Sequence, residues 1–373
     1  MKIKTIEAIA VSLPMKKPVQ MAGETVARAD NVLVRIESAD GIVGWGEAAS
    51  APVMTGETVA GMMAAIELMT PGLIGRDAGD FAAAAAAMDA RLYGNSGAKA
   101  AIDIALCDLV GRATRRPVHA LFGGRARGRM PVLAVIGSPD VAADLDEART
   151  RWAAGYRAFK IKVGLGTAGA DAERTCAVTA ALKGLGECLV SADANQGFGV
   201  ADALDYVRAV DGCGLDFFEQ PVAAHDLDGM ARVAAASRVP IGADEGLHGA
   251  DDIVRHHDRK AAQGGSLKAI KLGGLRPLFA AAQLTARLGM AINISCKTGE
   301  SSVASAAAAH LATVVPALAW GLTVTNPGLA EDVAVEPVAV VDGHVEVSDR
   351  PGLGIEVDER RVRRCQQDVR RVA

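Results

Sequence analysis

Three acidic residues at near-equal intervals constrain this chain more than any other feature of its sequence. Asp193 ends the segment CLVSAD, Glu219 ends LDFFE and Asp244 ends VPIGAD, so they lie 26 and 25 residues apart, each directly after an apolar run. A strand, a helix and two loops together take roughly 25 to 30 residues. Each repeat therefore brings one acid to the same end of a β-strand, and in a (β/α)₈ barrel that end carries the active site.

The three acids predict a divalent metal site. Taken singly, Asp193 could cap a helix and Glu219 could pair with a surface arginine, but three hard oxygen donors at successive strand ends favour a shared ligand set. Carboxylates with water suit Mg²⁺, with Mn²⁺ as the alternative, and the series contains no histidine, which disfavours zinc. Glu245 follows Asp244 directly; because strand side chains alternate in direction, we assign only Asp244 to the metal.

A lysine pair precedes the acids. Lys160 and Lys162 in FKIKVG are two residues apart on a predicted strand, so both side chains share one face. Lysine is rarely buried without a partner, and a nearby dication together with Lys160 would favour the neutral form of Lys162. We therefore expect Lys162 to act as a base, with Lys160 supporting it.

A second lysine pair follows the acids, in KAIKLGG. Lys268 and Lys271 are three residues apart, so on one strand they would point to opposite faces and only one would face the barrel axis. The position relative to Gly273-Gly274 favours Lys271, which we expect to be the second acid/base residue.

The alternation of apolar runs with helical patterns predicts an α/β fold of two parts. Residues 1–125 read as an α+β capping domain with a hairpin at Asp40-Gly41. Residues 126–334 read as a TIM-type parallel barrel, and the β-rich tail, about 335–373, is expected to return to the capping domain. The eight expected barrel strands are 131–136, 158–163, 188–193, 215–219, 240–244, 268–271, 291–296 and 322–325.

Composition excludes several classes of protein. The formal charge of −4 gives no electrostatic case for binding nucleic acid or an anionic membrane. The six cysteines are scattered without zinc or disulfide spacing, which indicates free thiols in a reducing cytoplasm. The first residues, MKIKTIEAIAVSLP, read as a strand rather than a signal peptide, and no apolar stretch is suited to span a bilayer.

The motifs resemble those of the enolase superfamily, and within it the muconate-lactonizing-enzyme subgroup. KIKVG is similar to the lysine motif of the second barrel strand, DANQ, EQP and ADE to the metal-ligand strands, and SLKAIKLGG to the lysine motif of the sixth strand. GESSVASAAAAHLA resembles the seventh-strand glutamate segment, GNSGAKAAIDIALCDL a capping-domain helix, and RPGLGIEVDE the C-terminal tail. The resemblance spans nearly the whole chain.

The resemblance implies a modified (β/α)₇β barrel and a reaction. A small carboxylate would bind Mg²⁺, and a lysine would remove or deliver its α-proton through a metal-stabilised enolate. Asn195 in DANQ and Glu300 are implied as supporting residues. The mandelate-racemase arrangement is not supported, because 288–300 contains no histidine. The resemblance also implies a homo-oligomer.

The overall reaction stays open between cycloisomerisation and racemisation or epimerisation. A dehydratase that eliminates water from a β-hydroxy acid or a hydroxyproline-like amino acid is an alternative, and an inactive scaffold of the same fold is another.

The substrate pocket is expected to be lined by the segments 15–30 and 49–58, with Met21, Met54 and Thr55, and by Thr325 in the eighth strand. Dipeptide epimerases of the subgroup carry an Asp-x-Asp pair near this strand, and its absence from GLTVTN disfavours a dipeptide. Lys297 in SCKTGES could hold a distal anionic group of the substrate, although solvation is the more frequent fate of a lysine.

Overall fold

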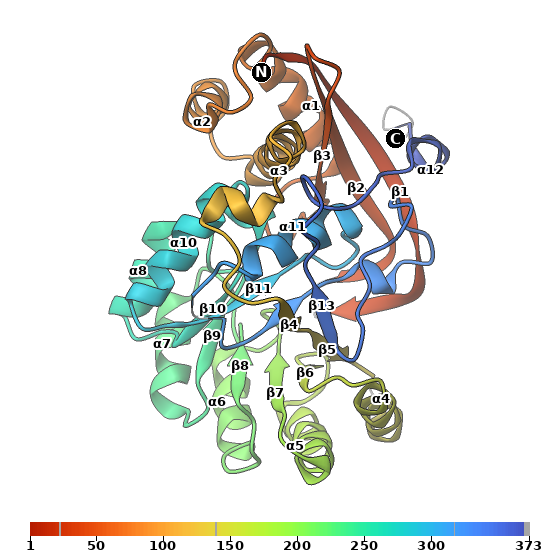
Figure 1. Cartoon of the computed structure of the whole chain (residues 1–373). Helices are drawn as coiled ribbons and strands as arrows, with labels where there is room; N and C mark the ends of the chain where they lie inside the picture. The colour runs from red at the N-terminus through yellow and green to blue at the C-terminus, as the bar shows by residue number, and fades with distance from the viewer. Residues whose placement is uncertain (22–23, 139, 317, 369–373) are drawn as a thin grey trace.

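A capping domain sits on a barrel in the computed structural model, which describes residues 1–21, 24–138, 140–316 and 318–368 (Figure 1). The capping domain contains the N-terminal strands and helices, and the barrel lies below it in the view of Figure 1. The α/β barrel class predicted from the sequence is confirmed.

The capping domain is a three-stranded antiparallel sheet covered by helices. Strands β1 (Ile3–Met21), β2 (Glu24–Ser38) and β3 (Val43–Ala49) pair in the order of the chain, and the turn at Asp40-Gly41 joins β2 to β3 as predicted. Segments 15–21 and 24–30, which belong to the stretch expected to line the substrate pocket, extend β1 and β2 into a long hairpin. Helices α1 (Val59–Met69), α2 (Phe81–Asp89) and α3 (Ser96–Ala113) follow, with short 3₁₀ turns at Thr70–Gly72 and Val118–Phe122.

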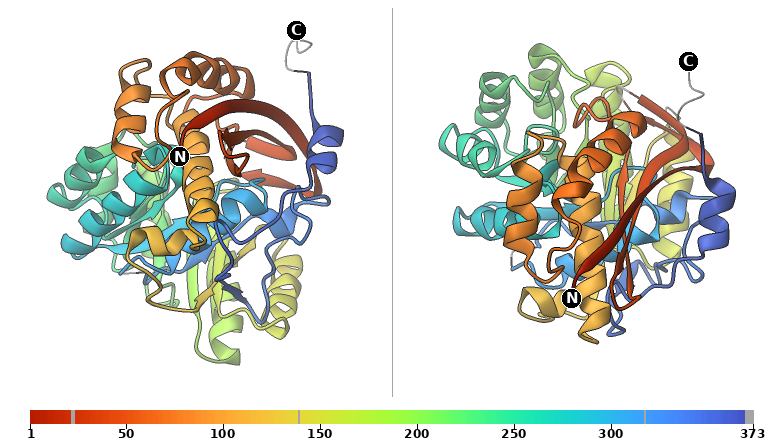
Figure 2. Two further views of the ribbon diagram at one scale, coloured as in Figure 1. Left: turned by 45° about the horizontal axis from the view of Figure 1, so that its top comes forward. Right: turned by 90° about the horizontal axis from the view of Figure 1, so that it is seen from above.

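Eight parallel strands form the barrel, in the same order in space as in sequence. An isolated bridge between Val132 and Leu322 joins the first and last strands, and Figure 2 shows the helices around the outside. The strands are β5 (Leu133–Ile136), β6 (Ala158–Lys162), β7 (Leu189–Asp193), β8 (Phe217–Glu219), β9 (Ile241–Ala243), β10 (Gly264–Leu267), β11 (Ala291–Ser295) and β12 (Leu322–Thr323). The helices are α4 (Val141–Ala153), α5 (Ala168–Leu185), α6 (Val200–Ala209), α7 (Leu227–Ala236), α8 (Ala250–Asp258), α9 (Ala269–Leu272), α10 (Leu275–Arg287) and α11 (Ser302–Ala312), with a 3₁₀ turn at Asn326–Gly328.

The sixth barrel strand was placed four residues too late from the sequence. The structure has β10 at Gly264–Leu267, and residues 269–272 form the short helix α9 instead of a strand. Glycine normally argues against a strand, but here it makes room for an aromatic plug: a methyl group at Gly264 would overlap the ring of Trp320. Trp320 stacks on Phe217 with ring centroids 4.1 Å apart and fills the barrel at the end away from the lysines and acids.

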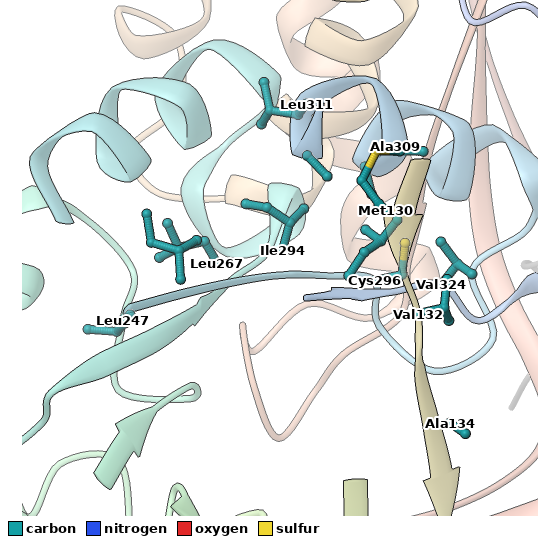
Figure 3. Packing of buried hydrophobic residues seen from close by; sticks show 14 of the residues in the cluster. Met130, Val132, Ala134, Leu247, Leu267, Ile294, Cys296, Ala309, Leu311 and Val324 are labelled. Carbon is teal, nitrogen blue, oxygen red and sulfur yellow. The ribbon is translucent and has the colours of Figure 1, made fainter. Parts of the chain in front are cut away.

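The remaining core is apolar and continuous between barrel strands and helices. Figure 3 shows Met130 near Ala309 of α11, Val132 near Val324, and Leu267 near Ile294 on the neighbouring strand. Dense apolar packing of this kind holds the strand ends in fixed positions, and these ends carry the polar residues of the site.

The C-terminal segment contacts both domains. Strand β13 (His344–Glu346) pairs with the short strand β4 (Arg129–Pro131), which precedes the barrel. Helix α12 (Glu359–Cys365) lies against the capping domain, where Arg363 pairs with Glu7 of β1 and the amide of Gln367 donates to Ala10. The tail thus closes around the edge of β1, as Figure 1 shows near the C-terminus.

Two buried carboxylates of the capping domain cap helices of the barrel. Glu47 of β3 accepts hydrogen bonds from the amides of Ser301 and Ala304 at the start of α11. Asp103 of α3 accepts from the amide of Leu275 at the start of α10, at 2.7 Å. The first amides of a helix have no partner within that helix, so these contacts fix the capping domain to the barrel at two points.

Candidate active site

A cavity of about 1030 Å³ opens at the carboxyl ends of the barrel strands, beneath the β1–β2 hairpin. Lys160 and Lys162 from β6, Asp193 from β7 and Asp244 after β9 all line it. Strand pairing places Lys162 beside Asp193 and Asp193 beside Glu219. The predicted site residues Lys162, Asp193 and Glu219 come from separate segments of the sequence. The strand pairing brings them together at one level of the barrel.

The lysine pair on β6 contacts the first two acids. The ammonium of Lys160 lies 2.6 Å from Glu219 and 3.9 Å from Asp193. The ammonium of Lys162 lies 2.6 Å from Asp193 and also donates to the side-chain oxygen of Asn195 at 2.7 Å. Both lysines thus point to the same face of β6, and each has a defined partner.

The lysine pair after β10 differs from the prediction. Lys268 directly follows the strand, donates to a carboxylate oxygen of Asp244 and lines the cavity. Lys271 lies on α9 with 1% of its surface exposed. It is not among the cavity-lining residues, and it donates to Asp244 and to the backbone oxygen of Ser266. The expectation that Lys271 faces the barrel axis is wrong, because the chain turns helical at Ala269.

Asn195 is held in an unusual backbone conformation between two charged residues. Its φ of 42° lies in the left-handed region, as does that of Gln196 at 69°, and such conformations concentrate at functional sites. The side-chain nitrogen of Asn195 donates to Glu245 at 3.0 Å, while its oxygen accepts from Lys162. Glu245 also lines the cavity, although the sequence led us to assign only Asp244 to the metal.

Burial and neighbouring charges act against each other on the acids. Burial acts to raise the pKa of Asp193, but Lys162 and Lys160 outweigh it and the pKa is lowered. The same balance, with Lys268 and Lys271 as the cations, lowers the pKa of Asp244. Burial prevails at the other two acids: it raises the pKa of Glu219, and that of Glu245 to about 7 with Asp244 adding to the effect.

The acids fit a hard divalent cation by the chemistry of their donors. Among the described residues no group of three His, Cys, Asp or Glu side chains is positioned to hold a metal ion. Lysine ammoniums contact an oxygen of each of the three acids. However, one oxygen of Glu219 and one of Glu245 are buried without a hydrogen-bond partner. Buried acceptors of this kind call for a ligand, and oxygen donors on neighbouring strands suit Mg²⁺.

The other residues expected in the pocket divide into two groups. Met21, Met54, Lys297 and Thr325 line the cavity. Thr55 is not among its lining residues: its hydroxyl instead accepts from the amide of Glu57 within the 50s turn.

The segment after β11 lies deeper than expected. Lys297 has 4% of its surface exposed, so its expected solvation is wrong. The hydroxyl of Thr325 donates to the backbone oxygen of Lys297 at 2.8 Å. Glu300 accepts from the amide of Lys297 and is buried behind the cavity wall, where burial and Glu47 raise its pKa to about 8.

The sequence carried a signal for Lys268 that the prediction overlooked. Asp193, Glu219 and Asp244 each directly follow the last apolar residue of their segment or strand, and Lys268 directly follows Leu267 in the same way. The same rule applied to the sixth repeat would have selected Lys268 over Lys271.

Comparisons with known proteins agree with this geometry. Residues 4–123 match the family model described as the mandelate racemase/muconate lactonizing enzyme N-terminal domain, and residues 143–361 match the enolase C-terminal domain-like model. A chloromuconate cycloisomerase of Cupriavidus pinatubonensis is 34% identical, over 95% of this chain and 96% of its own. An N-succinyl-L-Arg/Lys racemase of Bacillus cereus is 32% identical, over 96% of both chains.

A solved structure is equally similar. The muconate lactonizing enzyme of Pseudomonas fluorescens, complexed with muconolactone, superposes with a TM-score of 0.93 at 33% identity, over 98% of this chain and 99% of its own.

Proposed function

Because this chain belongs to the mandelate racemase/muconate lactonizing enzyme family of the enolase superfamily, we propose that it is a Mg²⁺-dependent isomerase that moves the α-proton of a small carboxylate. The superfamily is Mg²⁺-dependent, and the relatives described above are a cycloisomerase, a racemase and a lactonizing enzyme. Racemisation, epimerisation and cycloisomerisation share this proton step. We therefore propose an isomerase that catalyses this proton step, without choosing among the three reactions.

One observation supports the proposal above the others: Lys162 and Lys268 both line the cavity, on opposite sides of the acid-bearing strands. Lys162 ends the second barrel strand and Lys268 follows the sixth, with β7, β8 and β9 between them. A substrate carboxylate bound beside these three strands would present one face of its α-carbon to each lysine. Lys268 thus takes the role that the sequence suggested for Lys271.

Asp193, Glu219 and Asp244 are the residues that would hold Mg²⁺, with Mn²⁺ as the substitute. A dication bound there would polarise the substrate carboxylate and offset the negative charge that develops when the α-proton leaves, which would lower the barrier by several kcal/mol. All three acids are almost fully buried, so the surroundings screen these charges little.

The chain's own residues would position and transfer the proton. One lysine removes the α-proton from its face, and the other returns a proton to the opposite face or acts as a cation beside the enolate. Asn195 fixes the direction of the Lys162 ammonium by accepting its hydrogen bond. The β1–β2 hairpin covers the cavity mouth with Met21, which reduces access of water.

Proton exchange in D₂O tests the proposal on a library of small carboxylates with Mg²⁺ present. We expect α-proton exchange by NMR without loss of mass, and we expect Lys162→Ala and Lys268→Ala each to lower turnover by about two orders of magnitude or more. If each variant still exchanges only one enantiomer, the reaction is a two-base racemisation. Loss of water would indicate the dehydratase, and an absence of exchange on every compound would contradict the proposal.

A further inference from the structure

We propose that Arg174 of α5 is a positioning residue, which together with Asp144 and Asp171 holds Lys162 in the orientation needed to reach one face of the substrate's α-carbon. The inference rests on the proposed function for the role of Lys162. Arg174 is not among the residues that line the cavity, so it would govern one of the two proton transfers without touching the substrate.

Arg174 forms a buried ion triad with two aspartates from different helices. Its guanidinium contacts a carboxylate oxygen of Asp144 on α4 and, at 3.1 Å, one of Asp171 on α5. All three residues have at most 6% of their surface exposed. Because desolvation offsets most of the attraction, a buried ion group of this kind is weak evidence for a role in stability. Its contacts with the backbone point instead to a role in fixing geometry.

The triad reaches the backbone of Lys162 directly. The guanidinium nitrogen of Arg174 that contacts Asp171 also donates to the backbone oxygen of Lys162. The ladder between β5 and β6 ends at the pair Ile136 and Ile161, so this oxygen lies beyond it. The rigid, planar fork of an arginine can serve several acceptors at once, and here it extends the fixed part of β6 to the residue that carries the base.

The two aspartates hold the loops on either side of Lys162. Asp144 accepts a hydrogen bond from the amide of Ser138, in the loop after β5, at 2.7 Å. Asp171 accepts one from the amide of Gly164, in the loop after β6, at 2.8 Å. Since Arg174 joins the two carboxylates, both loops and the end of β6 are tied to one buried group.

The side chain of Lys162 is thereby fixed at both ends. Gly137, which precedes Ser138, lies against its stem: a methyl group there would be 3.1 Å from Cβ of Lys162. At the other end the ammonium donates to Asp193 and Asn195. A catalytic group held in this way is already close to its reacting geometry, which is a large part of the benefit of an intramolecular reaction.

Lys268 is held separately. It follows β10, on the other side of the acid-bearing strands, and its carboxylate partner is Asp244. A change in the triad should therefore displace Lys162 and leave Lys268 in place. This selectivity distinguishes a positioning residue from one that only stabilises the fold.

Backbone hydrogen exchange of the protein without ligand tests the positioning directly. Arg174→Lys keeps the charge but replaces the planar fork with one ammonium, and Arg174→Met removes both. We expect the amides of residues 163–165 to lose protection by about tenfold or more, the usual scale for a lost hydrogen bond to a charged group, while the other barrel strands keep theirs. Should Arg174→Met fail to fold, Arg174→Lys decides. Unchanged exchange at 163–165, or an equal loss in every strand, overturns the proposal.

Stereospecific proton exchange then separates the two lysines. Each enantiomer of a chiral carboxylate from the library is incubated in D₂O with Mg²⁺, and Lys162→Ala identifies the enantiomer that depends on Lys162. We expect Arg174→Lys to slow that exchange by about 10 to 100 times and the other by less than about threefold, since a misplacement of about 1 Å costs up to two orders of magnitude. Equal slowing of both, or of neither, overturns the proposal.

Arg208→Lys is the matched control. Arg208 on α6 also pairs with an aspartate three residues earlier, Asp205, but the two side chains are exposed, at 64% and 69%. This variant should exchange both enantiomers and the amides of 163–165 at wild-type rates. A loss confined to one enantiomer in Arg208→Lys would show that the effect is not specific to the triad, and would refute the role of Arg174.

The outcome is separable from that of the proposed reaction. Backbone exchange at 163–165 needs no substrate, so it decides whether Arg174 fixes the end of β6 even if the wild type exchanges no α-proton and the proposed function is refuted. If the wild type exchanges both enantiomers and Arg174→Lys slows them equally, the proposed function is retained and the positioning role is refuted.

Discussion

The two lysines of KAIKLGG should respond to the same substitution in opposite ways. Lys271→Met removes an ammonium whose side chain is fully buried and which contacts a carboxylate oxygen of Asp244, the backbone oxygen of Asp244 and that of Ser266. Removing one partner of a buried ion pair costs about 3–5 kcal/mol. Lys268→Met removes one contact with Asp244, at a wall that water can reach through the cavity, so its stability cost should be smaller.

The expected shift in melting temperature follows from the size of the protein. An unfolding entropy of about 2.1 cal/mol/K per residue over 373 residues gives roughly 0.8 kcal/mol/K. A loss of about 3–5 kcal/mol then lowers the midpoint of Lys271→Met by about 4–6 °C. Calorimetry measures this shift, and the stereochemistry of proton exchange in D₂O measures the catalytic role.

The two assays should separate the variants. Lys268→Met should lose exchange of one enantiomer's α-proton with a small thermal shift, whereas Lys271→Met should show the larger thermal shift and still exchange both. If Lys271→Met melts at the wild-type temperature and loses one enantiomer's exchange, the roles assigned to these two residues are reversed and the reasoning fails.

Four other outcomes are expected. Asp193→Asn should abolish activity and weaken Mg²⁺ binding by calorimetry with little change in fold, and wild-type turnover by this variant in the presence of chelator would contradict the metal site. Gly264→Ala should destabilise the protein by about 1–3 kcal/mol, because the added methyl overlaps the Trp320 plug; an unchanged urea midpoint would refute this. Burial raises the pKa of Glu47 to about 7, so the folded state favours the protonated form, and stability should fall as the pH rises from about 4.5 through 7. Glu47→Gln should flatten that fall in a pH series of melting curves, and an equally steep fall would exclude Glu47 as its source. Light scattering should give a mass well above the 38.3 kDa of one chain, since we expect a homo-oligomer, and a monomer mass would refute it.

Periodic features were readable from the sequence, and features set by tertiary contacts were not. Asp193, Glu219 and Asp244 follow apolar runs at a constant spacing, so the barrel and the level of its acids could be predicted. The strand at Gly264–Leu267 could not, because its glycines are explained by the ring of Trp320, more than fifty residues further along the chain. The error in Lys271 follows from that one misplaced strand.

Burial of polar residues was likewise beyond the sequence. Lys297 lies in a polar segment that is typical of an exposed loop, yet the hairpin and Thr325 enclose it. Thr55 stands beside Met54 in sequence, but its hydroxyl stays within its own turn. The burial of Lys297 depends on segments that are distant along the chain, whereas the contact of Thr55 is a local one that the residue types alone do not indicate.

The helix caps provided by Glu47 and Asp103 bear on how the two domains could be exchanged between relatives. A chimera that joins this barrel to a foreign capping domain would remove the acceptors of the amides of Leu275, Ser301 and Ala304 unless the donor carries an acid at both positions. The β1–β2 hairpin at the cavity mouth also belongs to the capping domain, but Glu47 lies on β3 and Asp103 on α3, outside the hairpin. Hairpin residues can therefore be replaced to redirect selectivity while the joint between the domains is preserved, so grafts limited to the hairpin are the safer unit for engineering this scaffold.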